Sequence, residues 1–110
     1  MVKRISLVWK RSDLSGAEFR RLWLGEHVAI AKQLPHLREY VIDFVTEGPT
    51  GSPAGIATLR FDNREELDSA LADPVLSKEL LRTREQFAAS VQVLFVDEET
   101  LVSRTRRNQR

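Results

Sequence analysis

The sequence predicts an α+β sandwich in which four antiparallel strands form one sheet and two helices cover one of its faces. Strand-like alternation and helix-like periodicity follow one another in the order strand, helix, strand, strand, helix, strand. Both helical segments open on a capping box, and a loop rich in glycine and proline joins the two middle strands. This order is that of the ferredoxin-like βαββαβ fold, and 110 residues suffice for one such domain.

The first strand and the first helix follow from local patterns. Residues 2–10 alternate as a strand does, so that one face carries three apolar side chains: Ile5, Leu7 and Trp9. Ser15 and Glu18 then form a capping box, in which each side chain satisfies a backbone N–H group of a helix start. The first helix is therefore predicted over residues 16–33. Gly25 falls on its outer side, and we interpret it as a surface glycine that costs about 1 kcal/mol relative to alanine.

The second strand, predicted over residues 37–46, is apolar on both faces, so each face needs a cover. Residues 47–55 follow as a loop that contains three glycines and two prolines. A phosphate-binding loop would need a helix directly after it. Residues 56–61 instead have the pattern of a third strand, so we interpret the loop as a flexible connection.

The second helix is predicted in two pieces. Asn63 and Glu66 form another capping box, and Pro74 after Asp73 marks a new start, because proline is favoured at the first helical position. Residues 90–96 then alternate as the last strand. Helices on one face would leave the other face bare and apolar. A symmetric homodimer, in which two sheets pack face to face into an α+β barrel, would cover it.

The composition narrows the class of protein. The net charge is +1, and thirteen of the seventeen basic residues stand against all sixteen acidic ones within residues 1–103, which argues against nucleic acid. We expect the domain to span these residues and residues 104–110 to be a basic, disordered tail. The absence of cysteine excludes disulfides and thiol chemistry and favours the cytoplasm. No stretch has the length of a membrane span or the form of a signal peptide.

Two titratable residues, Glu26 and His27, stand in the apolar stripe of the first helix. From His27 to Leu34 the helix descends about 10 Å. The second strand then climbs back about 10 Å to Tyr40. We therefore expect His27 and Tyr40 to face each other as catalytic residues. Five other side chains would form the substrate-binding walls: Trp9, Trp23, Glu26, Ile30 and Phe44.

Other kinds of site are weaker alternatives. A histidine in an apolar stripe is often a satisfied core residue, and a tryptophan there often only packs. His27 and His36 are the only histidines, and no ligand set converges on a metal. An RNA-recognition domain shares the element order, but its third strand needs stacking aromatic residues where this chain has Ile56 and Thr58.

A series of residues resembles the EthD family of dimeric α+β-barrel proteins. The series runs Phe19, Trp23 and His27 at four-residue intervals, then Leu34-Pro35, Leu37 and Tyr40. Further positions that fit are Arg11, Leu14-Ser15, Ala72-Asp73-Pro74, Phe87 and Glu98-Glu99. Thr83 departs from the family pattern, which is more acidic before the late phenylalanine.

The resemblance implies a homodimer with a small-molecule cavity between helices and sheet, and it matches His27 and Tyr40 to the cavity residues. Relatives include cofactor-independent isomerases, cyclases, dehydratases and decarboxylases of lactones and polyketide-like compounds. We therefore expect cofactor-free proton transfer by His27, with Tyr40 bound to the developing enolate and Glu26 orienting the imidazole. A non-catalytic protein that binds a hydrophobic metabolite for an oxidative degradation or biosynthetic pathway is the alternative.

Overall fold

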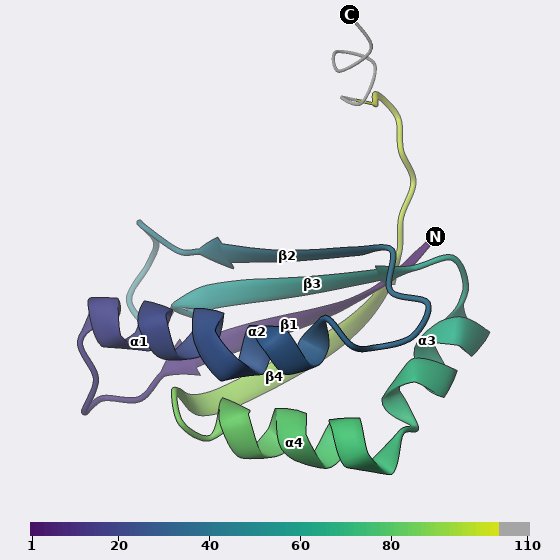
Figure 1. Cartoon of the computed structure of the whole chain (residues 1–110). Coiled ribbons are helices and arrows are strands. Elements are labelled where there is room, and N and C mark those ends of the chain that lie inside the picture. Colours follow the sequence, from purple (N-terminus) through teal and green to yellow (C-terminus); the bar gives the residue numbers. More distant parts are fainter. Residues whose placement is uncertain (104–110) are drawn as a thin grey trace, which may run out of the picture.

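The computed structural model describes residues 1–103 and confirms the predicted α+β class and its order of strands and helices (Figure 1). The tail predicted over residues 104–110 lies outside the described residues. In chain order the elements are β1 (Val2–Lys10), α1 (Gly16–Leu22), η1 (Trp23–His27), α2 (Val28–Ala31), β2 (Glu39–Phe44), β3 (Gly55–Phe61), α3 (Arg64–Leu71), α4 (Pro74–Arg84) and β4 (Ala88–Asp97).

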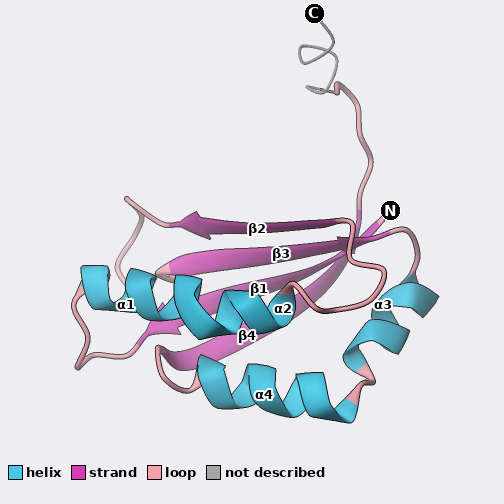
Figure 2. Ribbon diagram, in the orientation of Figure 1, coloured by secondary structure: helices cyan, strands magenta, loops and turns pink. Residues whose placement is uncertain are grey.

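The strands form one antiparallel sheet in the order β2-β3-β1-β4. Strand β1 is therefore central, with Val2 opposite Phe61 of β3 and opposite Asp97 of β4. The helices of the described chain all lie on one face of this sheet (Figure 2). Strand β2 covers Glu39–Phe44 and is shorter than the predicted range of residues 37–46. Leu37 was predicted to face the side opposite Tyr40, but it lies before the strand and packs against the helix-side core.

The first helix is not continuous, which corrects the prediction of one helix over residues 16–33. A wider π-helical turn, η1, interrupts it, and Gly25 within this turn has non-helical backbone angles of φ −84° and ψ −119°. Gly25 is exposed, and a Cβ atom there would meet no atom within 4 Å apart from its chain neighbours and the backbone of its own helix, so packing does not require a glycine at this position. The wide turn holds more residues than an α-helical turn and therefore changes which side chains face the sheet.

Two buried clusters fill the space between helices and sheet. The first consists of Leu34, Leu59, Phe61, Leu67 and Ala70. The second is largely aromatic and consists of Val8, Phe19, Trp23 and Phe87. Trp23 stacks on Phe87 with ring centroids 5.2 Å apart. A Cβ atom on Gly55 would lie 2.3 Å from the Trp23 ring, so β3 needs a glycine at the point where this ring crosses it.

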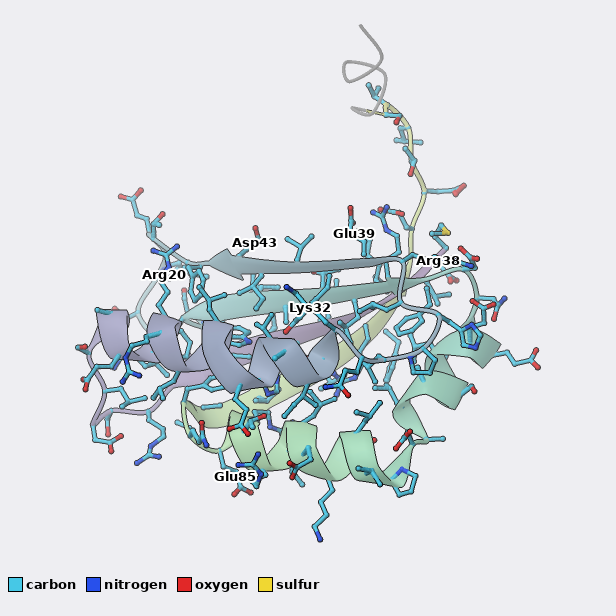
Figure 3. All side chains as sticks on the ribbon, viewed as in Figure 1. Arg20, Lys32, Arg38, Glu39, Asp43 and Glu85 are labelled. Carbon is cyan, nitrogen blue, oxygen red and sulfur yellow. The ribbon has the colours of Figure 1, made fainter. Side chains whose placement is uncertain are left out.

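The opposite face of the sheet carries apolar side chains with no helix over them among residues 1–103. Ile5 of β1 lies opposite Leu94 of β4, and Leu94 is 43% exposed. Val41 of β2 is 38% exposed on the same face. Asp43 and Glu39 of β2 also point away from the helices (Figure 3). No helix within the described residues is long and apolar enough to cross a membrane.

Candidate active site

A cavity of about 310 Å³ lies between the helices and the sheet. Side chains of η1, α2 and α4 face side chains of all four strands across it. Both core clusters contribute to its apolar wall, which includes Val8, Trp23, Leu34, Leu59, Leu80 and Phe87. Its polar wall consists of Arg4, Ser6, His27, Tyr40, Ser77 and Arg84. The two residues predicted as catalytic, His27 and Tyr40, therefore line one cavity.

His27 is held by a residue of another helix. Its Nδ1 atom lies 2.7 Å from the Oγ1 atom of Thr83, which belongs to α4 and is fully buried. The Thr83 hydroxyl also lies 3.0 Å from the Glu79 carbonyl oxygen and 3.2 Å from the Leu80 carbonyl oxygen. The edge of the imidazole ring contacts Phe87, with centroids 5.2 Å apart. These contacts fix the position of the ring.

The same contacts determine which imidazole nitrogen carries the proton. Carbonyl oxygens only accept hydrogen bonds, so a Thr83 hydroxyl that pointed its proton at His27 would set its own lone pairs against two carbonyls. The hydroxyl therefore donates to the main chain of α4 and accepts from Nδ1–H of His27. The Nε2 atom of His27 then carries the free lone pair.

The surroundings of His27 also keep the ring uncharged. Burial lowers its pKa from 6.5 to about 4, and the guanidinium groups of Arg84 and Arg4 act in the same direction. A hydrogen bond to the Leu80 carbonyl opposes them. Since the pKa lies well below neutrality, the imidazole at pH 7 is a neutral proton acceptor.

Tyr40 is held in the opposite protonation state. Burial raises the pKa of its hydroxyl to about 12, against a smaller lowering effect of the Trp23 side chain. The phenol therefore keeps its proton at neutral pH and can donate a hydrogen bond to a negatively charged oxygen. A proton acceptor and a proton donor thus share the wall of one largely apolar cavity.

Glu26 does not belong to this site, which corrects the prediction that it lines the cavity and orients His27. Its side chain is 53% exposed and pairs with Arg82 at 2.7 Å. The reason is the wide turn η1, which rotates Glu26 away from the face that carries Trp23 and His27. Thr83 takes the orienting position instead.

Three of the predicted wall residues also lie elsewhere. Trp9 is on the open face of the sheet, and its indole N–H donates to the Gly51 carbonyl at 2.9 Å. Successive side chains of a strand alternate between its two faces, so Trp9 lies on the face that does not carry the cavity-lining side chains of β1. Phe44 packs into the aromatic cluster, and Ile30 is buried, but neither lines the cavity. Trp23 does line it.

Sequence reasoning missed four polar residues of the cavity wall, which are Arg4, Ser6, Ser77 and Arg84, and also Thr83, which holds His27. Arg4 shares a face of β1 with Ser6 and Val8, and alternation separates this face from that of Trp9. Alternation does not say which face the helices cover, and the prediction of Trp9 as a wall residue assigned the wrong one. Arg84 stands in the last turn of α4, where a basic residue is common for other reasons. Thr83 stood out only as a departure from the family pattern. No group of three or more His, Asp or Glu residues within the described chain is placed to hold a metal ion.

These features define a ferredoxin-like α+β domain with a histidine and a tyrosine in the wall of a cavity between its helices and its sheet. The model of the EthD domain matches residues 11–91, and the chain belongs to the EthD family. The resemblance inferred from the sequence is thereby confirmed. No curated protein sequence matches the chain.

Solved structures share the fold. An ethyl tert-butyl ether D (EthD) family protein from Bacillus halodurans C-125 is 19% identical, with a TM-score of 0.73 over 90% of this chain and 99% of that chain. SnoaB, a cofactor-independent oxygenase from Streptomyces nogalater, is 14% identical, with a TM-score of 0.67 over 93% and 97%. A dimeric protein of unknown function from Bacteroides fragilis is 16% identical, with a TM-score of 0.65 over 88% and 95%. At these identities the likeness shows the fold alone.

Proposed function

We propose that this protein is a cofactor-independent enzyme that transfers a proton at the carbon next to a carbonyl group in a small, largely apolar substrate. The observation that carries the proposal is the contact between His27 and Thr83 in the wall of the cavity. It orients the ring and leaves Nε2 as an unprotonated base.

In the proposed reaction, Nε2 of His27 takes a proton from the carbon next to the substrate carbonyl. The carbonyl becomes an enolate, and the imidazole becomes an imidazolium ion that returns the proton to carbon. Isomerisation, cyclisation and dehydration can begin with the removal of such a proton. Decarboxylation ends with the return of a proton to the carbon of an enolate. A positioned histidine contributes about a hundredfold to ten-thousandfold in rate.

Tyr40 would stabilise the enolate. Its hydroxyl keeps its proton because its pKa is raised to about 12, so it can donate a hydrogen bond to the oxygen on which charge develops. The low pKa of His27 makes the ring a weak base, and its conjugate acid returns the proton readily. Stabilisation of the enolate by Tyr40 is therefore needed for the first step.

The proposal includes a homodimer that packs two open sheet faces together. The apolar side chains on this face, among them Ile5, Val41 and Leu94, would then leave water. The Bacteroides fragilis protein with this fold is described as dimeric, which supports the same arrangement here. The cavity lies on the other face, so each subunit would keep its own site.

The test follows exchange of carbon-bound protons for deuterium by NMR in D₂O. Two benzyl ketones serve as trial substrates: phenylacetone, which is uncharged, and phenylpyruvate, which carries a carboxylate. The wild-type protein should accelerate exchange of the protons next to the carbonyl in at least one of them. His27→Asn should lower this rate about a hundredfold or more, and Tyr40→Phe should lower it less, because it removes one hydrogen bond. His36→Asn, at an exposed histidine outside the cavity, is the matched control and should keep the full rate.

Wild-type rates that persist in His27→Asn would remove this histidine from the mechanism. If both ketones bind in the cavity and neither exchanges faster than in buffer, the proposal fails in favour of the alternative, a non-catalytic protein that binds a hydrophobic metabolite. In that case His27→Asn and Tyr40→Phe would each weaken binding by about 1 to 3 kcal/mol through lost hydrogen bonds.

A further inference from the structure

Two guanidinium groups face the cavity without a carboxylate partner. Arg4 comes from β1 and Arg84 from the last turn of α4. Arg4 donates to Ser6 Oγ at 3.2 Å, and neither arginine forms an ion pair within residues 1–103. Arg82, two positions from Arg84, shows the usual alternative, because it pairs with Glu26 and Glu79 at the surface.

Two guanidinium groups that face a cavity without a carboxylate raise the free energy of the folded protein. The cavity wall contains two arginines and a histidine and no acidic residue. Burial and the charge of Arg84 both lower the pKa of Arg4, and no carboxylate acts in the opposite direction. Charged groups removed from water are normally paired, since an unpaired charge loses its hydration without compensation. The cavity therefore lacks one negative charge that its own residues do not supply.

We propose that the cavity binds an organic carboxylate, with its carboxyl group between Arg4 and Arg84 and its apolar body against the aromatic wall. This inference rests on the proposed function, because it names the class of substrate for the same site. The guanidinium group presents two parallel N–H donors that match the two oxygens of a carboxylate. A cavity of about 310 Å³ has room for a ring-sized apolar body beside that group.

Binding of the carboxylate would also raise the pKa of His27, the proposed base. Arg84 and Arg4 both lower the pKa of His27, so an anion between them offsets their effect. The imidazolium ion formed during proton transfer then becomes easier to form, and the pKa of His27 moves towards the neutral range in which a general base works best. Substrates without the carboxylate leave His27 a weaker base. Charge in the substrate thus serves both binding and chemistry.

The test compares two ligands of the same shape that differ in charge: cinnamate and cinnamamide. Their dissociation constants are measured by isothermal titration calorimetry with the full-length protein at low salt. Cinnamate should bind at least about tenfold more tightly than cinnamamide. Arg84→Gln and Arg4→Gln should each weaken cinnamate binding about tenfold and leave cinnamamide binding within about twofold.

Arg82→Gln is the matched control, because it removes a guanidinium group from the same helix but outside the cavity. It should leave the binding of both ligands unchanged. Circular dichroism shows whether each variant is folded, and the two single variants give independent tests. Equal binding of the two ligands by the wild type, no saturable binding of cinnamate, or a preference for cinnamate that survives in both cavity variants would overturn the proposal.

The outcome separates this inference from the proposed function. A preference for cinnamate that depends on Arg4 and Arg84, without any proton exchange in the two ketones, would support the carboxylate site and reject the enzyme. Exchange that depends on His27, with no preference for cinnamate, would support the enzyme and reject the carboxylate site.

Discussion

The two faces of the sheet use the same strands for different purposes. On the helix side, Trp23 and Phe87 are each 1% exposed and Phe61 is fully buried, whereas Leu94 on the open side is 43% exposed. Central strand β1 serves both faces, because its alternation sends Val8 inward and Ile5 outward. The comparison teaches that the buried core and the cavity share one face and that the other face keeps apolar side chains open. Under the proposed function, the first face would carry the chemistry and the second the association. Substitutions on the two faces should therefore have separable effects.

The largest contrast should come from the two tryptophans. Trp23→Ala removes a fully packed ring and should lower the free energy of unfolding by about 3 to 5 kcal/mol. Trp9→Ala on the open face should cost at most about 1 kcal/mol in a dilute, monomeric sample. Urea unfolding curves of both variants provide the measurement. Equal losses would break the distinction between the faces.

Association should respond to the open face. Leu94→Asp places a charge among apolar side chains and should weaken the proposed dimer roughly a hundredfold, which lowers the mass seen by light scattering towards 12.6 kDa. Val75→Asp, at a side chain of α4 that is 69% exposed on the helix side, is the control and should leave the mass unchanged. A wild-type protein that is already monomeric at micromolar concentration would reject the dimer.

The cavity face should also show a pH dependence of stability. His27 has a folded pKa of about 4 against 6.5 in the unfolded chain, so between these values the unfolded state binds more protons. Stability is therefore complete above pH 6.5 and falls, by about 1 to 3 kcal/mol, as the pH decreases towards 4. Comparison of urea midpoints for wild type and His27→Gln across this range isolates the effect. A variant that loses as much stability as the wild type would show that His27 is not its source.

The smallest effect is expected one residue away from His27. Glu26→Gln breaks only an exposed pair with Arg82 and should change the free energy of unfolding by less than about 0.5 kcal/mol. It should also leave proton exchange unaffected, because Glu26 lies outside the cavity. A loss of exchange as large as that in His27→Asn would show that Glu26 takes part after all. Comparison of the variants at Glu26 and His27 thus locates the edge of the site along the first helical segment.

Much of the fold was accessible from sequence because it depends on local rules. Ser15 and Asn63 begin helices in the structure as predicted, since a cap needs only neighbours three residues away. The capping box is complete at Ser15, whereas at Asn63 only the side-chain oxygen accepts from the backbone N–H of Glu66. Alternation in β1 also sorted Ser6 and Val8 from Ile5 correctly. The break of the first helix was missed, because Gly25 alone does not reveal whether a helix continues through it or widens.

The candidate site divides in the same way. The sequence by itself predicted that His27 and Tyr40 face each other between helix and sheet. The helical period puts His27 in the apolar stripe, and the lengths of the helix and the strand bring Tyr40 to the same height. Both residues line the cavity in the structure. Only the tertiary structure decided what surrounds them. Thr83 and Arg84 are more than fifty residues from His27 in the chain, and they reach it because α4 packs against η1. Packing between distant helices depends on the shape of whole side-chain surfaces, which no local period in the sequence encodes.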